Sequence, residues 1–383
     1  MRNVGIVCEF DPYHNGHRYL TDTVRERGAR SVICVLSGDF TQRGDVAAFD
    51  KQLRAGCAVK HGADLVIELP PPFSCACSEV FAKAAVKLLA AAGADTLSFG
   101  TEISDIGLLK EAAEISESIK TDKRTTEFTA LGLSYPAAVS RCIELYYGDQ
   151  YSRVFSSPNA TLAVEYIKAA KEHGIENFLP IKRKGASHNG EPVGNIACAS
   201  YIRQLLREKR DASRFTPFDL DSQPPAFIEN MGRHIVYSVC NATPEMLRAC
   251  PDCTINLADR IIKLSREKPV NLEDMLSMLK CRDITLARLR RVVLFIAAGL
   301  EDMQLSELNA ARVLAFNKKG AELLKKAKDS GVALTTSLAK AAELCPKAAR
   351  NTERASYFRH LCTAQDTPAP NEYTRRIIIE REF

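Results

Sequence analysis

The chain has 383 residues, of which 46% are hydrophobic and 26% are charged, a composition typical of a globular protein. At roughly 100–200 residues per domain, this length predicts two or three domains. The sequence has no uncharged apolar run of about 18 residues and no basic and apolar leader, so we expect a cytoplasmic protein without a membrane partner. Lys and Arg number 52 against 47 Asp and Glu, too small an excess to indicate a nucleic-acid partner by itself.

The 13 cysteines stand mostly alone within apolar stretches, as small buried side chains do in a reducing compartment. The C-x-x-C pair formed by Cys250 and Cys253 has no second pair at zinc spacing to complete four ligands. The sequence therefore predicts no protein-bound metal ion. Nothing in it indicates an oligomeric state.

Short β-rich runs alternate with helical patterns over the first 210 residues. The predicted strands are residues 4–8, 31–37, 64–69, 96–100 and 177–182, and the predicted helices are residues 17–27, 52–60, 79–92 and 159–171. This alternation produces a parallel sheet covered by helices on both faces. We therefore predict an α/β fold with a Rossmann-like, doubly wound parallel sheet over residues 1–210.

Beyond about residue 215, amphipathic helical patterns replace the β-rich runs until about residue 350. Residues 211–225, rich in proline and aspartate, are the expected linker. Residues 226–383 are therefore expected to form a mostly α-helical second domain, and this half of the chain carries the excess of basic residues. A late β-like run at 377–379 can add a strand to either domain.

The strongest chemical signal follows the first predicted strand, where residues 10–17 read Phe-Asp-Pro-Tyr-His-Asn-Gly-His. A doubly wound sheet binds ligands at the carboxyl ends of its strands, and a helix N-terminus there attracts phosphate. Gly16 lets the backbone approach a ligand, and His14 and His17 can donate hydrogen bonds to phosphate oxygens. Two histidines at this spacing can also be core residues, surface residues or metal ligands, but the surrounding pattern favours a nucleotide phosphate.

Residues 10–17 resemble the H-x-G-H signature of the nucleotidyltransferase superfamily. Three longer stretches narrow the resemblance: Ser-Gly-Asp-Phe-Thr-Gln-Arg-Gly at 37–44, Gly-Ala-Asp-Leu-Val-Ile-Glu-Leu-Pro at 62–70 and Leu-Ser-Phe-Gly-Thr-Glu at 97–102. Together they are similar to the tRNA(Met) cytidine acetate ligase family. The resemblance covers most of the first 210 residues and the helical half only loosely.

The resemblance implies an ATP-dependent ligase that acetylates the wobble cytidine of elongator tRNA(Met) with free acetate. Acetate would attack the α-phosphate of ATP, which gives acetyl-adenylate and pyrophosphate. The exocyclic amine of the cytidine would then take the acetyl group and release AMP. ATP is thus a substrate, Mg²⁺ is expected because pyrophosphate needs charge neutralisation, and His14 and His17 are the expected catalytic residues.

The resemblance also implies an ATP site made by the first strand, its loop, the following helix and a few later residues. Its expected members are Ile6, Val7, Cys8, Glu9, Phe10, Asp11, Pro12, Tyr13, His14, Asn15, Gly16, His17, Arg18, Tyr19, Gly100, Asn159, Arg183, Ser200 and Arg203. Gly100 can equally be a turn glycine, Asn159 a helix cap and Arg183 part of a solvated charge run. Cys198 stands where relatives carry a serine, and the loss of one hydroxyl donor would weaken triphosphate binding by about 1 kcal/mol.

Basic residues in two places are expected to contact RNA. Arg43 follows the second predicted strand and can bind an RNA phosphate or the acetate carboxylate, or can be an ordinary exposed arginine. A cationic cluster in the helical half consists of Lys318, Lys319, Lys325, Lys326 and Lys328. Such a cluster often serves only solubility, but an adenylate-forming domain in the same chain favours RNA contact.

Two other functions stay open from the sequence. A small-molecule adenylyltransferase would use the same loop, although such enzymes are compact single domains and this chain is much longer. A degenerate nucleotide-binding module that escorts RNA would need no chemistry, although His14, Gly16 and His17 are intact.

Overall fold

The structure is a computed structural model that describes residues 2–120, 122–184, 191–282, 284–327 and 331–380. Its centre is a mixed sheet with the strand order β5-β4-β1-β2-β3-β6-β7, and β8 pairs with β6. The N-terminal strands are β1 (Arg2–Cys8), β2 (Ala29–Ser37), β3 (Leu65–Leu69), β4 (Thr96–Thr101) and β5 (Asn177–Lys182). Neighbouring strands among these five pair in parallel, which confirms the predicted Rossmann-like, doubly wound sheet.

Helices cover both faces of this sheet because alternate side chains of a buried strand point to opposite sides. The helices of this layered body are α1 (Asn15–Glu26), α2 (Lys51–Lys60), α3 (Ser78–Ala91), α8 (Pro158–Lys171) and α9 (Ala199–Arg207). Cys34 of β2 faces the apolar core shared with α1 and α2, and its neighbour Ile33 faces the core shared with α3 and α8. The two cores fix the carboxyl ends of the strands, where the loops of the site begin.

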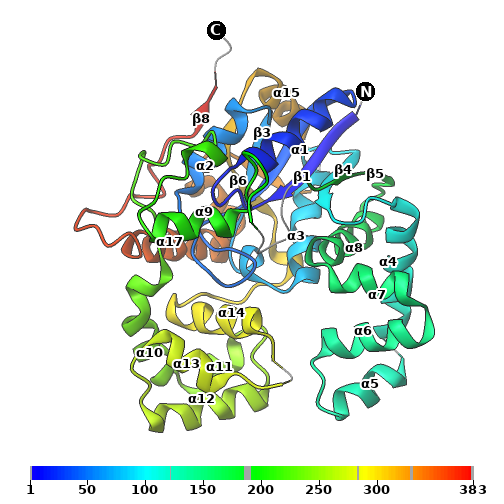
Figure 1. Ribbon diagram of the computed structural model, residues 1–383. Helices are drawn as coiled ribbons and strands as arrows, with labels where there is room; N and C mark the ends of the chain where they lie inside the picture. Colours follow the sequence, from blue (N-terminus) through cyan, green and yellow to red (C-terminus); the bar gives the residue numbers. More distant parts are fainter. Residues whose placement is uncertain (1, 121, 185–190, 283, 328–330, 381–383) are drawn as a thin grey trace.

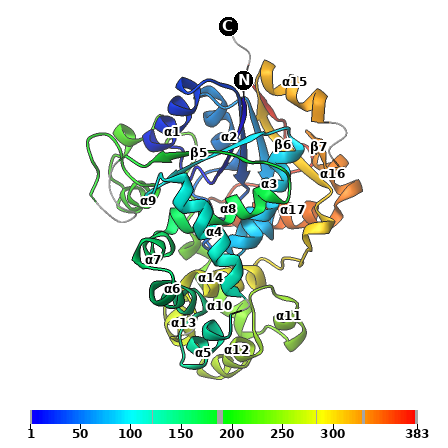
Figure 2. The same cartoon turned by 90° about the vertical axis from the view of Figure 1, so that its right-hand side faces the viewer.

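Two groups of helices extend beyond the sheet at its lower end in Figure 1, and the view in Figure 2 agrees. The first group comprises α4 (Ile106–Lys120), α5 (Lys123–Ala130), α6 (Tyr135–Tyr146) and α7 (Asp149–Ser156). The second comprises α10 (Gly232–Cys240), α11 (Pro244–Ala249), α12 (Ile255–Glu267), α13 (Leu272–Leu279) and α14 (Leu286–Ala297). The second group has a core that includes Ile235, Leu257 and Leu289, so a helical unit follows the expected linker.

The C-terminal part of the chain differs from the expectation of helices up to residue 350. β6 (Ala310–Phe316) runs antiparallel to β3, and β7 (Ala333–Thr335) and β8 (Ile378–Ile379) pair with β6. The helices α15 (Lys318–Lys326), α16 (Leu338–Leu344) and α17 (Pro346–Leu361) accompany these strands. The helical prediction is wrong at β6 because a short, fully buried apolar run has the same pattern in a strand and in a helix.

A buried ion cluster ties this returning segment to the N-terminal half. Nζ of Lys51, at the start of α2, lies 2.8 Å from Asp39, 2.8 Å from Glu68 and 3.0 Å from Glu372. Arg312 of β6 lies 2.6 Å from Glu372. The Lys51 side chain is 0% exposed, so the three carboxylates, and not water, stabilise its ammonium charge.

Candidate active site

The loop between β1 and α1 places two histidines at the start of a helix. His14 caps α1: its Nδ1 accepts a hydrogen bond from the Gly16 N–H at 3.0 Å, and its own N–H donates to Nδ1 of His17 at 3.2 Å. The two imidazole rings stack with their centroids 3.6 Å apart. A helix N-terminus carries partial positive charge and unpaired N–H groups, so it attracts anions.

These hydrogen bonds determine which ring nitrogens carry protons. Burial, and next to it the nearby charge of Arg183, lowers the pKa of His14 to about 3. Burial also holds the pKa of His17 well below its usual value. Both rings are therefore neutral at pH 7, and because Nδ1 is the acceptor in each ring, the proton lies on Nε2. The loop thus presents two Nε2–H donors of the kind that phosphate oxygens accept.

Side chains beneath the loop hold it in place. Asp11 accepts a hydrogen bond from the Ala48 N–H at 2.6 Å, and its carboxylate lies 3.3 Å from the guanidinium of Arg203. Asn15 donates to two backbone carbonyls of later loops, at 2.7 and 3.0 Å. Asp11 and Asn15 therefore act by positioning the histidines.

Several predicted ATP residues point into the core instead of into the site. The buried side chains are those of Ile6, Cys8, Phe10, Pro12 and Tyr13. They shape the loop from within the core. Arg18 is exposed, and its guanidinium lies 3.7 Å from Asp22 on the same helix.

The carboxyl ends of β4 and β5 form a second wall beside the histidines. A Cβ built at Gly100 would lie 3.6 Å from Cγ of Arg183, so this arginine extends over the glycine. After burial, the charge of Arg183 contributes to lowering the pKa of both histidines. Asn159 donates to Glu102 at 2.5 Å, so its amide orients a neighbour at the same edge. Gly100 therefore lies against Arg183, and the charge of Arg183 acts on the histidine pair.

The start of α9 forms a third wall. Arg203 donates to the backbone carbonyl of Asp11 at 2.6 Å, and its charge also lowers the pKa of His14. Sγ of Cys198 lies 3.1 Å from Oγ of Ser200, so the two side chains form a hydrogen-bonding pair. Arg203 therefore links α9 to the histidine loop and adds a second guanidinium to the site.

Two residues that the sequence analysis does not single out support the same edge. Arg54 of α2 is fully buried and donates to the carbonyls of Phe49, Glu9, Ser37 and Gly38, so it joins the ends of β1 and β2. Gln42 donates its backbone N–H to Glu9 at 2.7 Å, and its side-chain amide donates to the Ala76 carbonyl at 3.1 Å. Gln42 falls within the 37–44 stretch that carries the family resemblance, whereas no local pattern marks Arg54.

Arg43 lies on the exposed side of the loop after β2. Burial lowers its pKa, while the neighbouring Glu9 raises it and the charges of Arg203 and Arg183 lower it. Arg43 therefore belongs to the same group of charges as the histidine loop.

The next residue, Gly44, fits this loop against α14. It has φ +77°, and a Cβ there would lie 2.4 Å from the backbone N of Arg291 and 2.6 Å from the carbonyl carbon of Arg290. We expect Gly44→Ala to lower the free energy of unfolding by about 3 kcal/mol, from left-handed backbone strain together with the steric clash. Urea denaturation measures this loss.

Gly28→Ala is the matched control, since Gly28 has φ +87° and nothing lies within 4 Å of the added Cβ. The free energy of unfolding of this variant should fall by only about 1 kcal/mol, from left-handed backbone strain alone. Equal losses in the two variants would show that the loop does not depend on its contact with α14.

The predicted lysine cluster lies far from this site. Phe316, at the end of β6, pairs with Leu65 at the start of β3, so α15 begins at the amino edge of the parallel strands. The histidine loop begins at the opposite, carboxyl edge, and Figures 1 and 2 both show α15 at the end of the molecule away from the two helix groups. Lys318, Lys319, Lys325 and Lys326 are exposed there. Lys328 lies outside the described residues.

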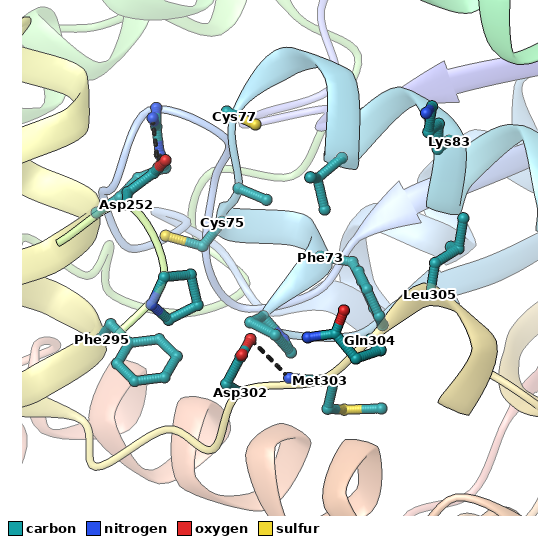
Figure 3. A pocket seen from close by; sticks show the side chains of 15 residues that line it. Phe73, Cys75, Cys77, Lys83, Asp252, Phe295, Asp302, Met303, Gln304 and Leu305 are labelled. Carbon is teal, nitrogen blue, oxygen red and sulfur yellow. Dashed lines mark hydrogen bonds and ion pairs between the residues drawn. The ribbon is translucent and has the colours of Figure 1, made fainter. Parts of the chain in front are cut away.

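A pocket of about 310 Å³ lies between α3, α14 and the segment 302–305 (Figure 3). Phe73, Phe295 and Met303 give it apolar walls, and Lys83, Asp252 and Asp302 add charged groups to its lining. Among the described residues that line this pocket, none belongs to the histidine loop. The pocket is therefore separate from the phosphate site, although Gln42 connects Glu9 to the carbonyl of Ala76 in its wall.

Within the described ranges, no three His, Cys, Asp or Glu side chains gather as a metal site would require. The Sγ of Cys250 instead donates to the Pro251 carbonyl at 3.3 Å. None of the described helices has the length and apolar character needed to cross a membrane.

Comparison with known proteins agrees with this geometry. A family model described as HIGH Nucleotidyl Transferase matches residues 1–372. The tRNA(Met) cytidine acetate ligase of Thermoanaerobacter sp. (strain X514) is 33% identical over 347 residues, which span 85% of this chain and 86% of that protein. The chain belongs to the tRNA(Met) cytidine acetate ligase family. The resemblance found in the sequence is thereby confirmed.

Other members of the tRNA(Met) cytidine acetate ligase family extend the comparison. The protein of that name from Streptococcus uberis is 34% identical over 335 residues, covering 86% of this chain and 87% of that protein. The crystal structure of Thermotoga maritima TmcAL bound with alpha-thio ATP superposes with a TM-score of 0.87 at 26% identity, over 100% of both chains. The fold described above is thus shared, over the whole chain, with a solved structure.

Proposed function

We propose that the chain is an ATP-dependent acetate ligase that forms N⁴-acetylcytidine at the wobble position of elongator tRNA(Met) in the cytoplasm. The observation that carries the proposal is the pair of neutral Nε2–H donors at the N-terminus of α1, with Arg183 and Arg203 nearby. This arrangement suits a polyphosphate that must be held without a covalent link to the protein. Membership of the ligase family supports acetate and tRNA as the other two substrates.

In the first step, an acetate oxygen attacks the α-phosphorus of ATP, and the bond to the β-phosphate oxygen breaks. Pyrophosphate leaves with the bonding electrons, and acetyl-adenylate stays in the site. Negative charge grows on the α-phosphate oxygens during the attack, where Nε2–H of His14 and His17 donate. Arg183 and Arg203 add charge stabilisation for the departing pyrophosphate.

Mg²⁺ is expected with the triphosphate, but the described carboxylates at this edge do not form a cage for it. Asp11 is bound to the Ala48 N–H and to Arg203, and Asp39 and Glu68 are bound to Lys51. The ion would therefore take its ligands from phosphate oxygens and water, as Mg²⁺ commonly does. No step of the proposal passes through a protein-bound metal.

The tRNA must bring its anticodon to the carboxyl edge of the sheet. Of the predicted RNA contacts, Arg43 lies at that edge, so we propose that it is the one nearest to the acetylated base. The lysines of α15 begin at the other edge, roughly 20 Å away along a strand of seven residues. Those lysines would contact only parts of the tRNA distant from the anticodon.

We expect pyrophosphate release to be independent of histidine titration. A free histidine changes charge near pH 6.5, but a pKa lowered to about 3 keeps His14 neutral well below that value. The rate of pyrophosphate release from ATP and acetate, measured on both sides of pH 6.5, should change by no more than about threefold through histidine titration. A steep fall in rate as the pH rises through 6.5 would show that the charged imidazolium is the active form.

Incubation with ATP and labelled acetate, with and without elongator tRNA(Met), tests the proposed function. The account expects label on the tRNA at the wobble cytidine, together with release of AMP and pyrophosphate. Pyrophosphate release that depends on a small nucleotide or phosphopantetheine acceptor would favour an adenylyltransferase. ATP binding with no product from any acceptor would favour a non-catalytic escort.

A further inference from the structure

The second step of the proposed reaction needs a group that accepts a proton. The amine of the cytidine forms a bond to the acetyl carbonyl carbon, the carbonyl carbon–oxygen bond to AMP breaks, and AMP leaves with the bonding electrons. The nitrogen loses one proton during this exchange. We infer that the carboxylate of Glu9 accepts this proton through Oε2 and later releases it to water, an inference that rests on the proposed function.

The histidines of the loop are unsuited to this task. Nδ1 of His14 accepts the Gly16 N–H, and Nδ1 of His17 accepts the His14 N–H. The remaining nitrogen of each neutral ring already carries a proton, so each ring can donate but has no free acceptor. The two rings therefore serve the phosphate, and the base is a different residue.

Other carboxylates at the same edge are already engaged. Asp11 accepts the Ala48 N–H and pairs with Arg203. Asp39 and Glu68 are almost completely buried around Lys51, where no substrate amine can reach them. Glu102, at the end of β4, accepts the amide of Asn159.

Glu9 has the position and the free acceptor that the step requires. It lies between the last residue of β1 and the histidine loop, and its side chain is only partly buried. Its Oε1 accepts the Gln42 N–H at 2.7 Å, which orients the carboxylate. Oε2 makes no hydrogen bond to any residue that the structure describes, so it can accept a proton from a substrate.

The surroundings of Glu9 also suit a base. Burial raises its pKa, as does the nearby charge of Asp11, while the Gln42 N–H and the charges of Arg203 and Arg43 oppose the rise. Arg54 is a further charged neighbour, since its guanidinium donates to the Glu9 backbone carbonyl. Burial raises the pKa values of three other neighbours and so keeps them uncharged at neutral pH: Cys8, Cys75 and Tyr166. A carboxylate with a raised pKa is a stronger base than one in water.

The test separates the two chemical steps. The full chain is given synthetic acetyl-adenylate and elongator tRNA(Met) in single turnover, and in a second assay it is given ATP and acetate. We expect Glu9→Gln to lower the ratio of acetyl transfer to adenylate formation by about 100-fold, the usual range for loss of a general base. Transfer by the unchanged protein should rise with pH until Glu9 is ionised and then level off, whereas Glu9→Gln should show no such rise.

Asp45→Asn is the matched control, because Asp45 is a neighbouring carboxyl group whose Oδ1 accepts the Val46 N–H, a bond that the amide preserves. It should keep both the ratio and the pH dependence. An unchanged ratio and pH profile in Glu9→Gln would overturn the inference.

If Glu9→Gln does not fold, Glu9→Asp takes its place as the test. Slower acetyl transfer, with its rise displaced to another pH, supports the inference. An unchanged rate of transfer and an unchanged pH profile overturn it. Failure of the unchanged protein to make acetyl-adenylate would count against the proposed function instead.

Discussion

Replacement of His17 by alanine should lower the rate of pyrophosphate release from ATP and acetate by about 100- to 1,000-fold, the usual cost of removing a hydrogen-bond donor to a developing oxyanion. The physical reason is the loss of the Nε2–H that is proposed to donate to the α-phosphate. The same change removes the acceptor of the His14 N–H, so His14 loses part of its orientation. Binding of elongator tRNA(Met), measured by filter retention, should stay within about threefold, because the role proposed for the loop is to bind the phosphates of ATP.

His173→Ala provides the control, since His173 lies exposed just after α8 and away from the loop. This variant should release pyrophosphate at the unchanged rate. If His17→Ala kept more than about a tenth of the activity, the loop would not be the main source of charge stabilisation in the transition state. A parallel loss of tRNA affinity in His17→Ala would contradict the separation of the two binding functions.

Replacement of Lys51 by methionine should lower the free energy of unfolding by about 3–5 kcal/mol, the range for breaking a buried ion pair from one side. Lys51 is the shared partner of Asp39, Glu68 and Glu372, all within 3.0 Å of its Nζ. Burial raises the pKa of Glu68 even with Lys51 present, so this carboxylate is the first to become protonated when the ammonium is lost. Chemical denaturation at pH 7 measures the effect.

The three carboxylates around Lys51 determine how the stability of Lys51→Met depends on pH. Without Lys51, their folded-state pKa values rise above the unfolded values, so the variant is least stable at neutral pH and its deficit shrinks as the pH falls. Lys60→Met, an exposed change at the other end of α2, should cost less than about 0.5 kcal/mol. A Lys51→Met variant as stable as the unchanged protein at pH 7 would show that the ion cluster does not join the C-terminal tail to the sheet.

The parallel strands and their helices were predictable because their hydrophobic patterns are local. The predicted strands at residues 4–8 and 31–37 coincide with β1 and β2, and the helix cap falls at His14. β6 was not predictable from its pattern, because its short apolar run is compatible with a helix and with a strand, and only its pairing with β3 makes it a strand. The four helices α4–α7 between residues 106 and 156 were also not predicted, although Asp122 is a capping residue that the sequence offers for α5.

The candidate site likewise contains residues that local motifs identify and residues that they do not. His14, His17, Gly100 and Arg183 were named from motifs, and the structure brings them to one edge of the sheet. The supports beneath them depend on distant segments, as with Arg54, which binds carbonyls at the ends of two strands. The place of the α15 lysines was not predictable either, since a run of lysines gives no information about which edge of the sheet it will occupy.

Transfer of oxygen from acetate to AMP tests the central claim, the attack of a carboxylate on the α-phosphorus held by the histidine loop. The protein is incubated with ATP, elongator tRNA(Met) and acetate labelled with ¹⁸O in both oxygens, and the AMP is analysed by mass spectrometry. The account predicts AMP with one ¹⁸O atom for each acetyl group transferred, because the bridging oxygen of acetyl-adenylate comes from acetate and stays with AMP. Acetylated tRNA accompanied by unlabelled AMP, or by ADP and labelled inorganic phosphate, would contradict it.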